Sequence, residues 1–255
     1  MLNTPPETIR SQVEANLARD LPLFVGQLAN KGCALIVGGG PSLNDRLPGL
    51  RFHHRRKGII FALNGAHDWL IERGIVPDFH VLLDARQENT RFVQKPHRAV
   101  TYLIASQCHP EVFDALKGQN VIQWNACLSN PDHDWEVAET FKHKPVMMVG
   151  GGSTVGLKTI NLTYLWGFRK IHLYGFDSSY KDGKNHAYRQ DINDAESPTE
   201  ITVSGKTFTC APWMTRQAEE FQRQYAQLQG LGVSIHVHGD GLIPWITKQH
   251  MENAA

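Results

Sequence analysis

The sequence predicts an α/β fold: a Rossmann-like, doubly wound, mostly parallel sheet with a short N-terminal helical extension and a lid insertion. Three observations lead to this prediction: short runs that are apolar at nearly every position, helical segments between them, and two glycine-rich stretches that directly follow such runs. Parallel strands covered on both faces are apolar throughout, and alternating strands and helices form doubly wound sheets. Ligands of such sheets bind beyond the carboxyl ends of the strands, so we expect the functional residues there.

Length and composition fit one globular domain with a short extension. The chain has 255 residues, of which 41% are hydrophobic and 20% charged, as in ordinary globular proteins. Its 26 Lys and Arg residues are balanced by 25 Asp and Glu residues, so no overall field attracts a nucleic acid or an anionic membrane surface. No stretch has the roughly 20 apolar residues of a membrane span, and the N-terminus lacks a signal-peptide pattern. We expect a cytoplasmic protein that binds anions locally.

The elements follow one another in a regular order. Apolar residues recur at helical spacing from Pro6 to Leu28, which predicts one or two amphipathic helices in an extension of residues 1–29. The main domain is expected over residues 30–245, followed by a tail of residues 246–255. Its expected strands are Ala34–Val37, Ile59–Leu63, Phe79–Leu83, Ala99–Ile104, Val121–Trp124, Pro145–Val149, Ile171–Tyr174 and Val233–Val237. Its expected helical segments are His67–Arg73, Glu111–Leu116, Val155–Trp166 and Met214–Leu228.

A long polar segment interrupts this alternation. Residues 178–212 are rich in Gly, Asp and Asn, with strand-like pieces only at Glu200–Val203 and Lys206–Thr209. A loop of this length in a compact domain is usually functional or disordered. Because it follows the carboxyl end of a strand, we interpret it as an active-site lid with a small hairpin. Its main proton-transfer groups are Tyr180, His186 and Tyr188.

The first candidate site is a glycine-rich turn after the first strand. It consists of Gly38, Gly39, Gly40, Pro41 and Ser42. Glycines let the backbone turn tightly and expose N–H groups to phosphate or carboxylate oxygens. The stretch is neither a Walker A motif nor a complete G-x-G-x-x-G fingerprint, and an ordinary strand–helix turn is the alternative.

Polar residues at the next strand ends extend this site. Asn64 and Gly65 follow one strand, Asp84 follows the next, and Ser106 follows the strand after that. An amide, a carboxylate and a hydroxyl at successive strand ends can face the same crevice. The structural alternatives are an Asx turn for Asn64 and a helix cap for Asp84.

A second glycine-rich turn opens a helix. Gly151, Gly152, Ser153 and Thr154 lie between the strand Pro145–Val149 and the helical segment that begins at Val155. A helix start with free N–H groups and two hydroxyls is a second place for a phosphate or carboxylate. Gly175 and Asp177 mark a further strand end, where the lid begins. We predict that the two glycine turns meet at one edge of the sheet and share one nucleotide.

Histidines and cysteines give no metal assignment. The basic run His53–Lys57 is interpreted as a solvated entry to the following strand. His236 and His238 alternate along a strand and share a face, but no carboxylate or cysteine accompanies them in sequence, so we assign no metal site there. The cysteines are far apart and form no C-x-x-C pair, so we expect reduced, mostly buried thiols at Cys33, Cys108, Cys127 and Cys210.

Taken together, these motifs resemble the MptE-like family. The ordered set is GGGPSL, NGA, GIVPDFHVLLD, GGSTVGLKTINLTYLWGFRKIHLYGFD and a downstream HAY. This family is named for 6-hydroxymethylpterin diphosphokinases and includes Maf-type flagellin glycosyltransferases. The motifs are also similar to those of small bacterial CMP-sialic acid sialyltransferases, with GGGPS, GFDSSY and His186 as the matching elements. Gly39 stands where those enzymes have Asn, and the aromatic residue of GFDSSY is displaced by one position.

The resemblance implies a transferase with one of two chemistries. In a sialyltransferase-like reaction, His186 would act as the base on an acceptor hydroxyl, Tyr180 and Tyr188 would assist the departing phosphate, and no metal would be required. In a diphosphokinase, Mg²⁺-bound ATP would give a diphosphate to a pterin-type alcohol, with Asp84 and Asp177 as metal ligands. The acidic residues of the diphosphokinase pattern near Asp84 and Ser153 are missing, which favours the glycosyltransferase. The expected partners are a nucleotide or nucleotide-sugar and a small-molecule or glycan acceptor; a homo-oligomer and a non-catalytic nucleotide-binding protein remain open.

Overall fold

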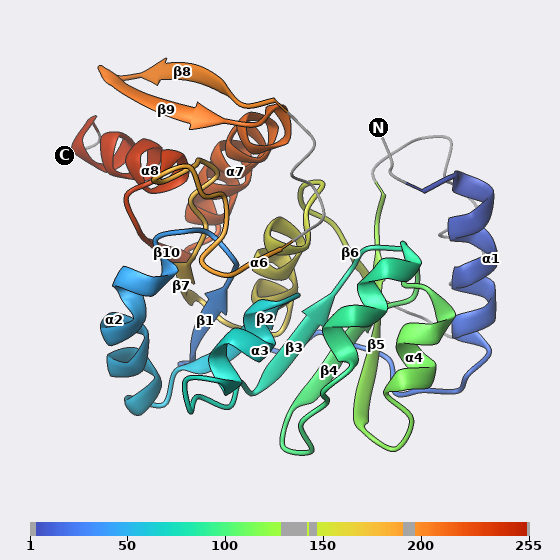
Figure 1. Ribbon diagram of the computed structural model, residues 1–255. Coiled ribbons are helices and arrows are strands. Elements are labelled where there is room, and N and C mark those ends of the chain that lie inside the picture. The colour runs from blue at the N-terminus through green and yellow to red at the C-terminus, as the bar shows by residue number, and fades with distance from the viewer. Residues whose placement is uncertain (1–3, 129–141, 143–146, 191–196, 254–255) are drawn as a thin grey trace. The chain divides into compact units, whose positions relative to one another are not determined.

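The computed structural model describes residues 4–128, 142, 147–190 and 197–253. The chain forms two compact units. The first comprises Met1–Ala29 and Phe61–Gly167, and the second comprises Asn30–Ile60 and Phe168–Ala255. Each unit combines segments that are distant in sequence (Figure 1).

The first unit is built on parallel strands. β3 (Phe79–Leu82), β4 (Thr101–Ala105), β5 (Asn120–Ala126) and β6 (Met148–Val149) follow one another in that order, and Phe61–Leu63 of β2 (Ile59–Leu63) pair with β3. The other elements of this unit are α1 (Pro6–Leu17), α3 (Ala66–Ile71), the 3₁₀ helix η1 (Gln87–Val93), α4 (Pro110–Ala115) and α6 (Val155–Leu165). The buried Asn16 amide holds α1 in place by donating to the carbonyl groups of Ser106 and Cys108, at 2.9 and 2.7 Å.

In the second unit, β7 (Lys170–Tyr174) lies between β1 (Cys33–Val37) and β10 (Ser234–His238), and both pairings are parallel. The helices are α2 (Leu43–Arg55), α7 (Pro212–Gly230) and α8 (Leu242–Asn253). A separate antiparallel hairpin consists of β8 (Thr199–Val203) and β9 (Lys206–Cys210). In Figure 1 this hairpin projects beyond α7 and α8.

The predicted fold class is confirmed. In each unit the strands of the main sheet pair in parallel, helices accompany them, and most of their residues are apolar and buried, as expected for parallel strands. Each expected strand has a counterpart within a few residues, and the hairpin in the predicted lid is present. Residues 145 and 146 of one expected strand lie outside the described part of the chain.

One local prediction was confirmed in part, and another was wrong. Of the segment Pro6–Leu28, only Pro6–Leu17 is helical, because the chain then runs extended: Leu23 forms a bridge with Gln123, and the Phe24 N–H donates to the Gln123 carbonyl at 2.7 Å. The run His53–Lys57 is not a strand entry, since α2 ends at Arg55. In addition, α8 continues through residue 246, where a tail was expected to begin.

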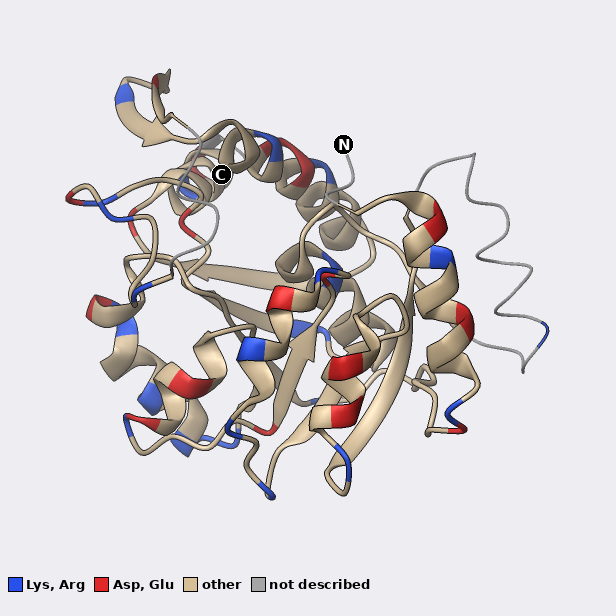
Figure 2. Cartoon of the chain, turned by 45° about the vertical axis from the view of Figure 1, so that its right-hand side comes forward, with Lys and Arg blue, Asp and Glu red and all other residues tan. Residues whose placement is uncertain are grey.

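The charged side chains are mixed in sign over the surface. Figure 2 shows Lys and Arg interspersed with Asp and Glu, as expected from a formal net charge of +1. Among the described residues, no helix is long and apolar enough to cross a membrane.

Candidate functional site

The carboxyl ends of β1 and β7 approach each other so closely that glycine is required on both. The Gly38 N–H donates to the Tyr174 carbonyl at 2.8 Å, and the Gly40 N–H donates to the Gly175 carbonyl at 2.9 Å. A Cβ on Gly38 would lie 2.7 Å from the Gly175 carbonyl oxygen, and one on Gly175 would lie 2.7 Å from the Gly38 oxygen. Gly175 also has φ +66°, a region that side chains disfavour. The close packing of the two strand ends therefore explains why positions 38 and 175 are both glycine.

The buried carboxylate of Asp177 closes this turn. Asp177 is 1% exposed, and its Oδ2 accepts from the Ser42 N–H at 3.0 Å. Gly241 packs against the same residue, since a Cβ there would lie 2.6 Å from the Asp177 Cβ. Burial raises the pKa of Asp177, although hydrogen bonding by Ser42 opposes the increase. The Asp177 carboxyl thus fills the end of the glycine turn and packs against Gly241 in the segment after β10.

The segment of the predicted lid that contains His186 contacts Gly39, the second of the three adjacent glycines. The Ala187 N–H donates to the Gly39 carbonyl at 2.9 Å, and the Asn44 amide donates to the Ala187 carbonyl at 3.1 Å. A Cβ on Gly39 would lie 2.6 Å from the Tyr188 hydroxyl oxygen and 2.9 Å from Cδ2 of His186. The fold therefore brings both side chains to the glycine turn, across 147 intervening residues between Gly39 and Ala187 in sequence.

Hydrogen bonding orients the His186 ring. Its Nδ1 lies 3.0 Å from the Asn185 Oδ1. An amide oxygen only accepts, so Nδ1 carries the proton and the ring lone pair is on Nε2. The His186 and Tyr188 rings are neighbours, with centroids 6.0 Å apart.

A polar pocket of about 250 Å³ lies beside the same turn. Its lining includes Pro41, Asp177, Tyr180, Lys181 and Lys206. The Lys181 ammonium bonds both Asp45 and Asp240, at 2.7 and 2.8 Å. These two carboxylates raise the pKa of Lys181.

The second lysine leaves this pocket positively charged on one side. The Lys206 ammonium donates to the Asp240 carbonyl at 3.1 Å and lies over the Phe208 and Trp245 rings. No side-chain carboxylate bonds Lys206 in the described residues, so its ammonium differs from that of Lys181, which two carboxylates bond.

The remaining predicted site residues belong to the first unit, where Asp84 is already engaged. Its carboxylate forms a forked ion pair with Arg86, with a shortest N–O distance of 2.6 Å, and also accepts the Arg86 backbone N–H. Asp84 therefore forms an Asx turn and does not cap a helix.

The backbone groups of Asn64 and Ser106 form hydrogen bonds with neighbouring elements of the first unit. Asn64 has φ +47°, and its carbonyl accepts from Nε2 of the buried His80 at 2.9 Å. The Ser106 N–H donates to the Trp124 carbonyl at 2.8 Å, and Ser106 is 3% exposed. Gly65 begins the turn into α3 as the residue before its first helical position.

The second glycine turn starts α6 as predicted. The Thr154 hydroxyl accepts the Leu157 N–H at 3.4 Å and so caps the helix. Gly151 and Gly152 have φ +89° and +24°, and Ser153 precedes the cap residue. A Cβ on Gly152 would collide with the Leu157 side chain.

The structure thus places the predicted residues in two groups. The second unit contains Gly38–Ser42, Gly175, Asp177, Tyr180, His186 and Tyr188. The first unit contains Asn64, Gly65, Asp84, Ser106 and Gly151–Thr154. One nucleotide shared by both glycine turns stays a prediction. Sequence reasoning did not find Asn185, Lys206 or the Lys181 carboxylate pair, because an exposed polar residue in a loop has no distinguishing pattern.

Fold and site together define a class: an α/β protein whose parallel strands end in glycine turns, with polar residues gathered at those ends, the arrangement of Rossmann-like ligand-binding proteins. The chain belongs to the MptE-like family, because the family model described as 6-hydroxymethylpterin diphosphokinase MptE-like matches residues 11–183. His186 and Tyr188 lie just beyond this match.

The chain is also similar in structure to the Maf glycosyltransferase from Magnetospirillum magneticum AMB-1. The TM-score is 0.67 at 17% sequence identity, over 96% of this chain and 41% of that one. This likeness shows the fold, and the chain spans less than half the length of that protein. A comparison with curated proteins found no match. The family and the structural neighbour both have the names of transferases.

Proposed function

We propose that this chain is a nucleotide-sugar-dependent glycosyltransferase, with a CMP-activated nonulosonic acid as donor and His186 as general base. The observation that supports it most is the contact of the His186–Tyr188 segment with the Gly39 turn. That contact puts a base and a phenol beside a turn at the carboxyl end of a parallel strand, where ligands of such sheets bind, and a sugar transfer from a nucleotide needs such a base.

The proposed reaction is a direct displacement. The Nε2 lone pair of His186 takes the proton of the acceptor hydroxyl while that oxygen bonds the anomeric carbon of the donor. The bond from this carbon to the phosphate oxygen breaks, and the nucleotide leaves with the electron pair. The Tyr188 hydroxyl donates a hydrogen bond to the leaving phosphate, and Tyr180 and Lys206 line the adjoining pocket. Asn185 keeps the Nδ1 proton in place, so the ring stays in the tautomer that can accept at Nε2.

The family name supports a second candidate, the transfer of a diphosphate from ATP to a pterin-type alcohol. This reaction needs carboxylates for Mg²⁺. The two predicted ligands already have partners: Asp84 pairs with Arg86, and the buried Asp177 accepts the Ser42 N–H. Their engagement favours the glycosyltransferase.

Turnover of candidate donors tests the choice. CMP-, UDP- and GDP-sugars, and ATP with 6-hydroxymethylpterin, are offered to the wild type and to His186→Ala, each with and without EDTA. We expect turnover of a CMP-linked donor that EDTA leaves unchanged. His186→Ala should lower kcat by about 10²–10⁴-fold, the usual value of a positioned acid–base group, with little change in nucleotide affinity.

His250→Ala is the matched control, since it removes an exposed histidine on α8. Full activity of His186→Ala would remove His186 from the mechanism. Turnover of ATP alone, lost completely with EDTA, would establish the diphosphokinase instead.

A further inference from the structure

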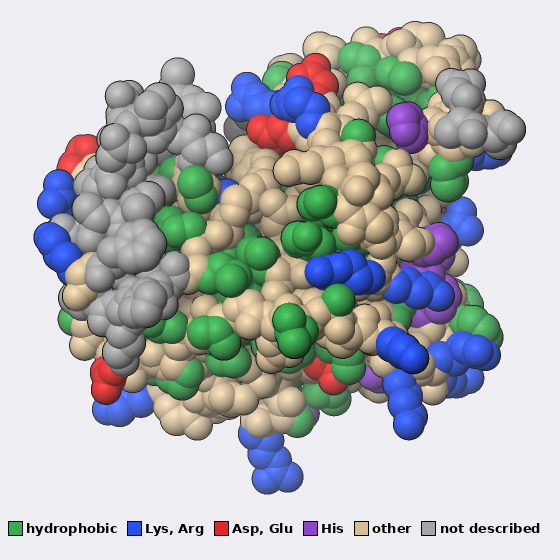
Figure 3. All heavy atoms as spheres, turned by 180° about the vertical axis from the view of Figure 1, so that it is seen from behind, with side chains coloured by type: hydrophobic (Ala, Val, Ile, Leu, Met, Phe, Trp, Pro, Cys, Tyr) green, Lys and Arg blue, Asp and Glu red, His purple; other side chains and the backbone are tan. Residues whose placement is uncertain are grey.

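Four histidines of the second unit gather on one side of the β7–β10 pair. His172 and His236 are register partners on β7 and β10, and His238 pairs with Tyr174 two positions further along. The C-terminal end of α2 adds His53, whose ring centroid lies 4.1 Å from that of His172. In the space-filling view from behind, histidine side chains reach the surface beside Lys and Arg (Figure 3).

Three of these histidines have the geometry of a metal site. One ring nitrogen from each of His53, His172 and His238 lies within 4.8 Å of the other two. Nδ1 of His172 and Nε2 of His238 are 2.7 Å apart. Zn²⁺ with nitrogen ligands at about 2.0–2.1 Å in a tetrahedron separates those nitrogens by roughly 3.3 Å. The three rings therefore need only small movements to close on one ion.

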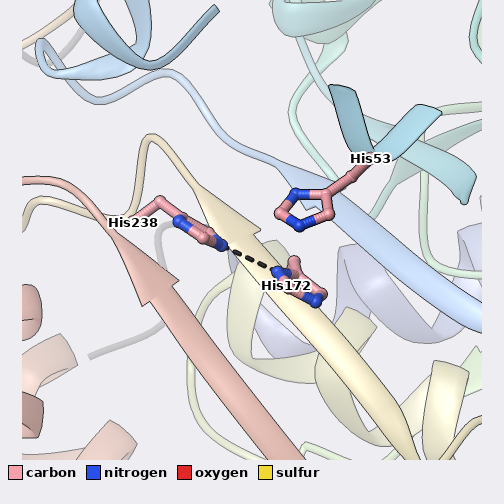
Figure 4. Close-up of side chains that lie close together, drawn as sticks. All are labelled: His53, His172 and His238. Atoms are coloured by element: carbon pink, nitrogen blue, oxygen red, sulfur yellow. Dashed lines mark hydrogen bonds between the residues drawn. The ribbon is translucent and has the colours of Figure 1, made fainter. Parts of the chain in front are cut away.

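The side chains already point inward. Figure 4 shows ring nitrogens of the three histidines facing the space between them, with His238 and His172 joined by a hydrogen bond. The Nδ1 of His53 bonds the Tyr174 hydroxyl at 2.5 Å. A hydrogen bond at the far nitrogen of a ligand histidine fixes its tautomer and ring orientation, and metal sites usually have one. Tyr174 can serve in this way for His53.

From these contacts we propose that His53, His172 and His238 bind Zn²⁺, with the fourth coordination position open to water or a small anion. His53 contributes Nε2, His172 contributes Nδ1 and His238 contributes Nε2. The proton between His172 and His238 moves to the far nitrogen of its ring, so both lone pairs face the ion. This site is separate from the residues proposed to bind or transfer the sugar.

The protonation state suits a metal ligand. Burial, followed by the neighbouring imidazoles, lowers the pKa of His172 to about 3 and that of His238 to about 4, and burial also lowers the pKa of His53. Burial thus favours the neutral form of the rings, which is the form that binds metals. The charged groups acting on them are the basic Lys170, Arg46 and Arg56.

The proposed ion would act as a structural link. It would join the end of α2 to β7 and to the edge strand β10. His238 is followed directly by Gly239, Asp240 and Gly241, and the last two line the pocket beside the glycine turn. Zn²⁺ would therefore hold one wall of that pocket, without taking part in the transfer itself.

Titration of the EDTA-treated full chain with Zn²⁺, in competition with a coloured chelator, tests the proposal. We expect one tight site per chain in the wild type. His238→Gln and His53→Gln should each weaken that affinity at least about 100-fold, because a ligand is lost. Tyr174→Phe should weaken it about 10–100-fold, the usual effect of removing an outer partner. His54→Gln, which removes the next histidine of α2, should leave it unchanged.

Co²⁺ provides a second readout, since its visible absorption distinguishes tetrahedral nitrogen coordination from surface binding. The folded state of each variant is checked by its melting temperature without metal. A wild type that shows no tight site, or His53→Gln and His238→Gln variants that bind Zn²⁺ as the wild type does, would overturn the assignment.

Discussion

Three adjacent glycines have three different neighbours. Gly38 faces the Gly175 carbonyl, Gly39 faces His186 and Tyr188, and Gly40 faces the carboxylate of Asp177. Only the second of these contacts involves residues to which we assign chemistry. In this glycine-rich strand end, Gly38 and Gly40 are explained by close packing, whereas Gly39 lies beside the residues proposed to be functional. The contacts of each glycine reveal this difference, and the amino-acid composition does not.

At the same scale, Asp177 has a structural role that can be measured. Asp177→Ala leaves the Ser42 N–H group without its buried acceptor. Losing a hydrogen bond to a charged group, with its partner left buried, costs about 1.5–3 kcal/mol. We expect urea unfolding to show a loss of this size, whereas Glu219→Ala, an exposed carboxylate on α7, should change stability by less than about 0.5 kcal/mol. Equal stability of the two variants would contradict the assigned role.

The joining of β1 to β7 is a property of elements, because it depends on both backbones at once. Val37 pairs with Tyr174 at the last register position, and the two chains then remain in contact through Gly38 and Gly175. This close approach positions the glycine turn next to the start of the lid at Asp177. The lid segment can reach Gly39 only because the strands are neighbours.

A matched pair of glycines measures this approach. Gly175 and Gly183 have similar φ values, +66° and +70°, but a Cβ on Gly183 would meet nothing within 4 Å. Gly183→Ala should cost only the left-handed backbone strain, about 1–2 kcal/mol. Gly175→Ala adds a collision with the Gly38 carbonyl, so we expect a further 1–3 kcal/mol. Denaturant unfolding of both variants gives the difference, and a difference near zero would mean that the strand ends can separate freely.

The elements also show how far sequence could lead. Apolar runs predicted the strands, because buried parallel strands have no polar face. Helix α2 was missed: it contains Pro48 and only Leu43 and Leu50 are buried, so it has almost no apolar period to detect. His53 was consequently assigned to a strand entry, and its meeting with His172 could not be foreseen. His186 was singled out from its place in a long loop after a strand end, and it lies beside Gly39; its role stays a prediction.

Across the whole chain, Lys, Arg, Asp and Glu are interspersed, whereas four of the histidines are concentrated in one cluster. The formal net charge of +1 gives no overall field, and Figure 2 shows residues of both signs interspersed along the ribbon. The histidines are less evenly placed, because the second unit combines four of them within one cluster. The response of the whole chain to acid should therefore depend strongly on that cluster.

The pH dependence of unfolding tests this, with EDTA present to exclude metal. The pKa of His172 is about 3 in the folded chain and about 6.5 in an unfolded one. Between these values the unfolded chain holds a proton that the folded chain does not, so the free energy of unfolding falls as pH falls below about 6.5. The slope is at most about 1.4 kcal/mol per pH unit for this residue. His238 contributes in the same direction down to its pKa of about 4.

Between pH 6.5 and 5, where carboxylates contribute less, we expect urea midpoints of His172→Gln to decline less steeply than those of the wild type. His250→Gln, which leaves the cluster intact, should follow the wild type. Parallel profiles for the wild type and His172→Gln would mean that His172 takes up a proton equally in both states, and that its burial does not resist acid.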